Sequence, residues 1–140
     1  MATVWLLRHA KADKDGRDGP ADFHRALTSR GRTQATALGS YLGKRPKKLD
    51  GIPTPELVLC SSARRTQETL AAVLGASGLR PRVEMLASIY GATEEEIAHT
   101  LTGYPYTTSI MVVGHEPTLG LLREDFLQSS DRSERPTGDC

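Results

Sequence analysis

The chain has 140 residues, which is enough for one domain with a single hydrophobic core but too short for two independent domains. Its net charge is +1, and a charge this close to neutral does not indicate a nucleic-acid partner. Hydrophobic residues make up 38% of the chain, yet none of its apolar runs approaches the roughly 20 residues of a membrane-spanning helix. Because no apolar signal segment follows the first residues, we expect a cytoplasmic protein that contacts no membrane.

The first apolar run, residues 4–7, ends abruptly at Arg8 and His9. Such a run is typical of a strand that is buried on both faces of a parallel sheet. Its polar end then lies at the carboxyl edge of the sheet, where open α/β sheets bind their ligands. Residues 12–24 contain two glycines, a proline and four aspartates, which indicates a loop. A long loop at this edge is expected to border the binding pocket.

A helix is predicted next, followed by a second strand. Thr28 or Ser29 can cap a helix that ends near Gly43. Its predicted buried face consists of Ala35, Leu38, Tyr41 and Leu42. We interpret the basic residues 44–48 as a solvated helix end rather than a nucleic-acid surface, since cations are favourable at a helix C-terminus. Residues 57–60 are apolar and predict a second buried strand.

The helix after the second strand is predicted to begin at a serine cap. Ser61 or Ser62 can supply this cap, while Gly75 and Gly78 are expected to end the helix. The apolar and small side chains that share one face of this helix are Thr66, Leu70, Val73 and Leu74. The helix is therefore expected to pack against the sheet.

The second half of the chain predicts two more strands and two more helices. Residues 82–86 are a weaker candidate for a third strand, and residues 93–96 form a capping-box pattern that opens a short helix. Residues 109–113 are the clearest strand, and Pro117 suits the first turn of a final helix. The expected apolar face of that helix consists of Leu119, Leu122, Phe126 and Leu127.

Buried strands that alternate with amphipathic helices predict an α/β fold, namely a three-layer α/β/α sandwich with a largely parallel central sheet. We expect one domain over residues 1–127. Residues 128–140 are polar and are expected to form a flexible C-terminal tail.

Three of the predicted strands are followed by residues that suit anion binding. Arg8 and His9 follow the first strand, Arg64 and Arg65 come shortly after the second, and His115 follows the last. The carboxyl ends of parallel strands meet at one edge of the sheet, so these side chains should lie close together. Guanidinium groups bind phosphate oxygens in pairs, and helix N-termini add backbone N–H donors. The sequence therefore predicts a phosphate site.

The histidines do not predict a metal site. The chain has four histidines, and none of their spacings is typical of metal ligands. His24 and His99 are expected to face solvent. We therefore predict neither a metal nor any other cofactor.

The same residues carry a resemblance to a known family, the histidine phosphatase superfamily. Four motifs occur in the order typical of that family, at residues 7–11 (Leu-Arg-His-Ala-Lys), 25–31 (Arg-Ala-Leu-Thr-Ser-Arg-Gly), 61–69 (Ser-Ser-Ala-Arg-Arg-Thr-Gln-Glu-Thr) and 114–117 (Gly-His-Glu-Pro). The Arg-His-Ala-Lys form of the first motif resembles the small SixA-like branch. This resemblance implies a phosphoglycerate mutase-like fold and a phosphatase that works without a metal.

The resemblance also implies roles for individual residues. His9 would be the nucleophile, which forms a phosphohistidine that water then hydrolyses. Arg8, Arg65 and His115 would hold the phosphoryl oxygens during the reaction. Arg25 would be a further contact to phosphate or substrate.

The roles of the second-strand arginine and of His115 are expected to be more specific. Arg64 could take the place of Arg65, but the family's spacing from Ser61 favours Arg65. His115 would serve best as a proton-bearing donor to the phosphoryl group, and the surrounding arginines are expected to lower its pKa unless phosphate is present.

The choice of substrate depends on whether a carboxylate can protonate the leaving group. The acidic residues that could reach the site are Asp13, Asp18, Asp22, Glu84 and Glu116, and none falls in a recognisable pattern. An imidazole leaving group protonates near neutral pH and so needs such an acid less than an alkoxide does. We therefore expect a phosphohistidine-bearing protein as the substrate. The alternatives are a phosphomonoesterase that acts on a small phosphorylated substrate and a non-catalytic phosphate-binding module.

The C-terminus departs from the family pattern. Relatives usually continue past the last helix into another strand at the edge of the sheet, whereas residues 128–140 contain no strand candidate. The sequence makes no prediction of the oligomeric state.

Overall fold

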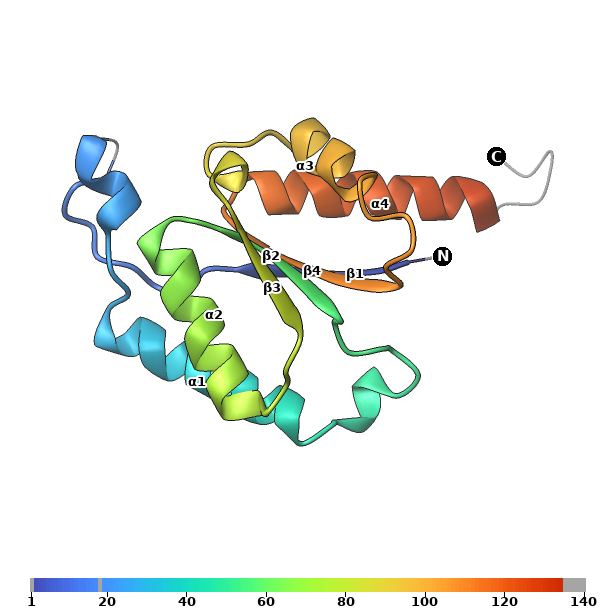
Figure 1. The fold of residues 1–140 in the computed structure, drawn as a ribbon, viewed down its shortest axis with the longest axis horizontal. Helices are drawn as coiled ribbons and strands as arrows, with labels where there is room; N and C mark the ends of the chain where they lie inside the picture. Colours follow the sequence, from blue (N-terminus) through green and yellow to red (C-terminus); the bar gives the residue numbers. More distant parts are fainter. Residues whose placement is uncertain (1, 18, 135–140) are drawn as a thin grey trace.

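Four parallel strands form the centre of the molecule, which the computed structural model describes over residues 2–17 and 19–134 (Figure 1). The strands are β1 (Thr3–Arg8), β2 (Leu57–Ser61), β3 (Arg82–Leu86) and β4 (Ser109–Gly114). Their order across the sheet is β1-β4-β2-β3, and all three pairings are parallel. Parallel neighbours need crossover connections, which the helices between the strands provide.

Two layers of helices cover the sheet (Figure 1). The helices α1 (Ser29–Gly43) and α2 (Arg64–Ser77) lie on one face, while α3 (Glu94–Leu101) and α4 (Thr118–Glu134) lie on the other. Short 3-10 helices occur in the connections, namely η1 (Pro20–His24), η2 (Lys47–Leu49) and η3 (Ala87–Ile89). The predicted three-layer α/β/α sandwich with a parallel sheet is confirmed. Within the described residues, no helix has the length and apolar character needed to cross a membrane.

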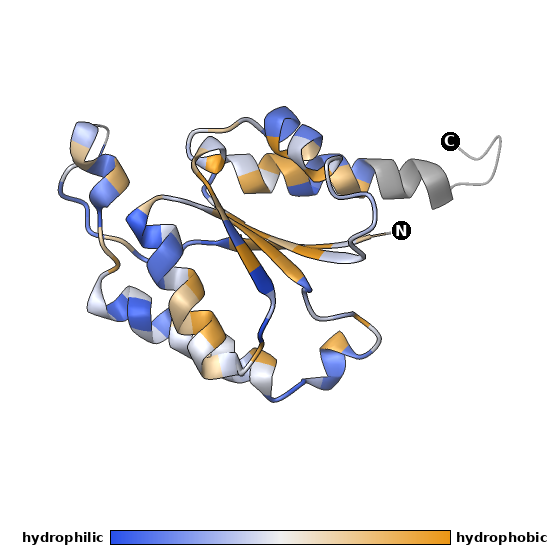
Figure 2. Ribbon diagram, in the orientation of Figure 1, coloured by the Kyte–Doolittle hydropathy of each residue, from blue (hydrophilic) through white to orange (hydrophobic). Residues whose placement is uncertain are grey.

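The hydrophobic core is divided into two apolar layers by the sheet. Side chains alternate between the faces of a strand, so Leu57 and Leu59 of β2 join one layer and Val58 and Cys60 join the other. Figure 2 shows the resulting concentration of apolar residues in the strands. β2 and β4 are buried along their whole length, and each buried Val, Leu or Ile side chain stabilises the fold by about 1.5–3 kcal/mol. These two central strands therefore fix the edge at which the polar residues emerge.

The buried face of α1 differs from the one predicted. Ala35 is buried and Leu42 is half-buried against the core, as expected. Leu38 and Tyr41 are exposed, however, and the other buried residues of the helix are Gly31 and Gly39. A Cβ atom at Gly39 would clash with the carbonyl oxygen of Val73 in α2. The two helices pack so closely that only small residues fit between them. The hydrophobic periodicity pointed to the larger side chains and missed this stripe of small ones.

Two of the predicted helix caps are confirmed and one is wrong. The Thr28 hydroxyl accepts a hydrogen bond from the Gly31 N–H at the start of α1, and Thr93 and Glu96 form the predicted capping box of α3. Ser61, by contrast, belongs to β2, and α2 begins after Ala63 without any side-chain cap. The Ser61 hydroxyl accepts from the Ala63 N–H at 3.3 Å and also contacts His115, just after β4.

The last helix is longer than predicted. The backbone remains helical from Thr118 to Glu134, so the helix continues past residue 127, after which we expected a tail. Leu119 and Leu122 are buried as predicted, whereas Phe126 is 36% exposed and Leu127 is 45% exposed. Within the described part of the chain, β1 pairs with β4 alone, and residues 135–140 of the predicted tail lie outside the described residues.

The close packing of α1 on α2 predicts a sharp effect of a single methyl group. Gly39→Ala should lower the free energy of unfolding by about 1–3 kcal/mol, because the new Cβ forces the helices apart. Gly75→Ala in α2 is the matched control, since a Cβ there meets no atom within 4 Å and should raise helix stability by up to about 1 kcal/mol. Urea denaturation of both variants checks the prediction, and equal effects would contradict it.

Candidate active site

The register of β1 against β4 brings two histidines together at the carboxyl edge of the sheet. Arg8, the last residue of β1, lies opposite Gly114, the last residue of β4. The His9 N–H continues the ladder by donating to the Gly114 carbonyl at 3.2 Å. His9 and His115 therefore leave neighbouring strands at the same level, and their ring centroids lie 5.5 Å apart.

A contact with the backbone of the next residue, Ala10, holds His9 in one tautomer. Its Nδ1 lies 2.7 Å from the Ala10 carbonyl oxygen, and a carbonyl can only accept, so Nδ1 carries the proton. Ala10 is fixed in turn, because its N–H donates to the Thr69 hydroxyl of α2 at 3.0 Å. Nε2 of the neutral ring is consequently left with a lone pair. His9 itself lines the open cleft at this edge.

The pKa of His9 is lowered below its ordinary value. Burial of the ring favours the neutral form and outweighs the hydrogen bond to Ala10, which acts in the opposite direction. The charges of the nearby arginines, with Arg65 the strongest, lower the pKa further. The ring is therefore neutral at pH 7, as a nucleophile requires.

His115 is also neutral. Burial is the largest cause that lowers its pKa to about 4, and the positive charge of Arg65 acts in the same direction. Its Nε2 lies 2.9 Å from the Ser61 hydroxyl at the end of β2. Its Nδ1 is buried and has no hydrogen-bond partner among the described residues. The predicted lowering of this pKa is confirmed, whereas the contact to Ser61 was not foreseen.

A carboxylate that the sequence did not single out as central connects the two arginines of the site. Asp22 accepts from Arg25 Nε at 2.9 Å and from Arg65 at 3.1 Å, while its backbone carbonyl accepts a second bond from Arg65 at 2.8 Å. The Tyr90 hydroxyl donates to the same carboxylate at 2.6 Å, and the Arg65 guanidinium lies 5.8 Å from the centre of the Tyr90 ring. Asp22 thus fixes the positions of Arg25, Arg65 and Tyr90.

Asp22 is ionised at neutral pH. Burial alone would raise its pKa, but the hydrogen bond from Tyr90, the charge of Arg65 and the hydrogen bonds from both arginines outweigh burial and lower the pKa. A carboxyl group in this state has no proton to give to a leaving group at neutral pH.

The other acidic candidates have other partners or lie elsewhere. Glu84 accepts from the Tyr104 hydroxyl at 2.7 Å, and Glu116 accepts from the Gly120 N–H near the start of α4. Asp13 meets Arg25 through its backbone carbonyl oxygen, not through its carboxylate. Asp18 lies outside the described residues. None of these contacts identifies a general acid.

The arginines differ in how they are placed. Arg65 is only 5% exposed, and its Nε is buried without a hydrogen-bond partner among the described residues. Arg64 is exposed and pairs with Glu68 one turn along α2, which supports the choice of Arg65 for the site. Arg8 and Arg25 both line the open cleft beside His9. The structure therefore gathers all five predicted site residues at one edge of the sheet.

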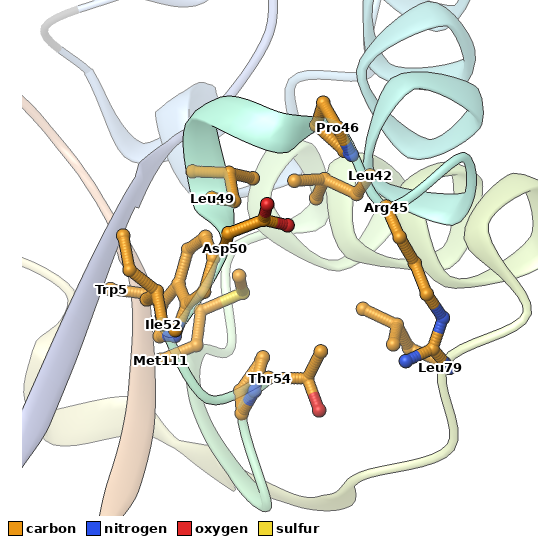
Figure 3. A pocket seen from close by; sticks show the side chains of 12 residues that line it. Trp5, Leu42, Arg45, Pro46, Leu49, Asp50, Ile52, Thr54, Leu79 and Met111 are labelled. Atoms are coloured by element: carbon orange, nitrogen blue, oxygen red, sulfur yellow. The ribbon is translucent and has the colours of Figure 1, made fainter.

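A second cavity lies beside the amino-terminal half of β1 and the C-terminal end of α1, away from the histidines. Figure 3 shows its mostly apolar wall, which includes Trp5, Leu42, Leu49, Ile52 and Met111, and its volume is about 210 Å³. No histidine lines it. Within the described residues, no group of three or more His, Cys, Asp or Glu side chains is placed to hold a metal ion.

Comparison with known proteins identifies the family. Residues 4–87 match the model of the histidine phosphatase superfamily (branch 1), and the chain belongs to this superfamily. Among curated proteins, the uncharacterized protein Rv1276c of Mycobacterium tuberculosis is 32% identical over 117 residues, which cover 83% of this chain and 66% of that protein. The chain thus spans about two thirds of the length of this relative.

Solved structures confirm the fold and the resemblance to the SixA-like branch. The structure of a proposed phosphohistidine phosphatase SixA from Nakamurella multipartitia has a TM-score of 0.77 and 31% identity, and the match covers 98% of this chain and 73% of that chain. A second proposed SixA, from Agrobacterium tumefaciens, has a TM-score of 0.74 and 28% identity over 93% of this chain and 83% of that chain.

The low pKa of His115 predicts an acid-sensitive fold. Below pH 6.5 the unfolded chain binds a proton at His115 that the folded protein excludes until the pH falls to about 4. Stability should therefore be greatest above pH 6.5 and fall through this window, by about 1–2 kcal/mol at pH 5 after allowance for partial exposure. Urea denaturation at pH 7.5 and 5.0 should show a smaller loss for His115→Gln than for wild type. His99→Gln, at an exposed position, should keep the wild-type pH dependence.

The carboxylate of Asp22 predicts a second stability effect. Asp22→Asn removes the charge that faces two guanidinium groups, so the free energy of unfolding at pH 7.5 should fall by about 2–3 kcal/mol. Inorganic phosphate should recover part of this loss, because it supplies negative charge to the same arginines. Asp50→Asn, which removes an exposed carboxylate in the connection between α1 and β2, is the control. A variant as stable as wild type would show that Asp22 does not hold the arginines.

Proposed function

We propose that the protein is a metal-independent phosphatase that works through a phosphohistidine on His9, with a phosphohistidine-bearing protein as its substrate. The observation that carries this proposal is the 2.7 Å contact between His9 Nδ1 and the Ala10 carbonyl oxygen. The Nδ1 proton is committed to the Ala10 carbonyl, so the lone pair of Nε2 is available in an open, cationic cleft. A module that only binds phosphate has no need of a neutral nucleophile among arginines.

In the first step, Nε2 of His9 attacks phosphorus in line with the leaving group. The new N–P bond forms as the bond from phosphorus to the leaving group breaks, and the electron pair departs with the leaving group. Arg8 and Arg65 remain charged throughout and stabilise the negative charge on the three equatorial oxygens. Splitting the transfer through a covalent intermediate lowers the barrier of each half.

In the second step, water attacks the phosphohistidine. The N–P bond breaks, its electron pair returns to Nε2, and orthophosphate leaves, so that His9 is restored in its starting tautomer. The Nδ1–H bond to the Ala10 carbonyl stabilises the positive charge that the ring carries while it is phosphorylated. His115 contributes as a donor to the phosphoryl oxygens once the charge of the phosphate opposes that of the arginines.

The lack of an identified proton donor favours a nitrogen leaving group. Asp22 is ionised, and the other acidic candidates have no contact that places them as a general acid. A departing imidazole can take its proton from solvent near pH 7, whereas an alkoxide depends on a nearby acid. The names of the two SixA structures that are about 30% identical also support this choice of substrate. A cytoplasmic location stays a prediction from the sequence.

Phosphate release tests the proposal. Wild type should release phosphate from a phosphohistidine-bearing protein in the presence of a chelator, and faster than from p-nitrophenyl phosphate. His9→Ala should reduce both rates by about 10³-fold or more, as expected for removal of a nucleophile. His99→Ala, which changes an exposed histidine on α3, should retain full activity.

Other outcomes would point to the alternative functions. Rapid turnover of a small phosphoester but not of the phosphoprotein would favour a small-molecule phosphomonoesterase. Binding of phosphate without turnover of any substrate would favour a phosphate-binding module.

A further inference from the structure

The cleft in front of His9 carries more positive charge than one phosphoryl group requires. Its volume is about 500 Å³, and none of the carboxylates in residues 2–17 and 19–134 lines it. The cationic residues that line it are Arg8, Lys11, Lys14, Arg17 and Arg25. Arg8 and Arg25 lie beside the nucleophile, whereas the other three come from residue 11 and the loop that follows it. The wall formed by Lys11, Lys14 and Arg17 is called the outer wall here.

Lys14 and Arg17 are held next to each other by a tight turn. The Arg17 N–H donates to the Lys14 carbonyl at 3.2 Å, so these two residues are the first and last of a four-residue turn and their Cα atoms are close. Gly16 occupies the third position with φ of +87°, a conformation that glycine adopts without strain. A Cβ atom at Gly16 would also lie 2.8 Å from the Ala21 Cβ. The turn is thus specified by the sequence.

The turn is anchored to the catalytic part of the site. The Asp13 N–H donates to the Ala26 carbonyl at 2.9 Å, and the Thr28 N–H donates to the Lys11 carbonyl at 2.9 Å. Arg25 donates to the Asp13 carbonyl from its guanidinium while its Nε holds Asp22. One arginine therefore contacts both the outer loop and the carboxylate that positions Arg65.

The positive charges of the outer wall are not neutralised by ion pairs within the described part of the chain. Lys11, Lys14 and Arg17 form no ion pair with any residue that the structure describes. Asp13 and Asp15 are exposed and do not line the cleft. Holding like charges together is unfavourable in the free protein. An anion in the cleft would convert this repulsion into binding energy.

We infer that the outer wall is a subsite for a second anionic group of the substrate, next to the phosphoryl group that His9 accepts. This inference rests on the proposed function and adds a specificity to it. The group that binds there is a carboxylate or a phosphate, close in the substrate to the phosphoryl group that is transferred. It can come from acidic residues that flank a phosphohistidine in a protein, or from a second phosphate on a small molecule.

Matched substrates test the subsite. Two phosphohistidine peptides, one with flanking glutamates and one with glutamines at the same positions, measure the first source of the anion. A hexose bisphosphate and the corresponding monophosphate measure the second. Wild type should prefer the anionic member of at least one pair, and the pair with the larger preference identifies the source. Equal kcat/KM values within both pairs would overturn the inference.

A double variant, Lys14→Gln with Arg17→Gln, tests the residues. It should raise KM for the preferred anionic substrate by about threefold to tenfold, the range expected for two exposed charges. The kcat for that substrate and all constants for p-nitrophenyl phosphate should stay within about twofold of wild type. Lys47→Gln with Lys48→Gln, on η2, is the charge-matched control and should leave the preference unchanged. An equal effect of both double variants would mean that only net charge matters, and would overturn the subsite.

Binding separates a failure of the subsite from a failure of the proposed function. If wild type hydrolyses nothing, the proposed function fails, but the affinity of the His9→Ala variant for the two phosphohistidine peptides still measures the subsite. The acidic peptide should bind more tightly, and its advantage should shrink as salt screens the exposed charges. If the two peptides bind equally at low salt, the subsite is overturned whatever the enzyme does.

Discussion

The site depends on one pairing, the parallel register of β1 against β4. Because the last residues of the two strands lie opposite each other, the histidines that follow them emerge together. A shift of this register by one residue would separate His9 from His115 and reverse the faces of every side chain in β1. The two apolar layers of the core resist such a shift, since both faces of β4 are buried. Core packing therefore fixes how His9 and His115 lie relative to each other.

Electrostatic balance is the second constraint on the site. The neutral imidazoles of His9 and His115 are partly buried, and so are the guanidinium groups of Arg25 and Arg65. The carboxylate of Asp22 compensates the positive charge of both arginines. Asp22 is well suited to this task because its charge is held by three donors and does not change near neutral pH. The arginines are consequently oriented before substrate arrives. Preorganised charge of this kind costs little reorganisation during the reaction.

The sequence predicted most of the fold and which residues gather at the carboxyl edge of the sheet, and the reasons for its failures are specific. Strand ends and local motifs lie close together in the chain, so Arg8, His9 and Arg65 could be found from short patterns. Tyr90 could not, because it reaches Asp22 from 68 residues away and carries no local signal. The spacing of Asp22 and Arg25 was a usable signal, since residues three apart meet in a single turn of 3-10 helix.

Helix faces were predicted less well for a different reason. Hydrophobic periodicity assumes that the largest apolar residues are buried, yet in α1 the closeness of α2 leaves room only for glycine at Gly39 and Gly43. In α4, Phe126 and Leu127 remain partly exposed. They lie beside Val4 and Leu6 of β1, which is an edge strand of the described sheet. Both cases depend on the distance to a neighbouring element, which a pattern within one helix does not contain.

The residues of the site fall into two groups that differ in how firmly hydrogen bonds and packing hold them. His9, His115 and Arg65 are attached to strand ends and to the first turn of α2, and backbone or buried contacts fix each of them. Lys14 and Arg17 belong to an exposed turn that is tied to this base by a few hydrogen bonds. Under the proposed function, substitutions in the turn change which anion is recognised without displacing His9. In this proposal, the hydrogen-bonded sheet edge supports the chemistry, and the loop that follows β1 is the part of the fold where specificity varies.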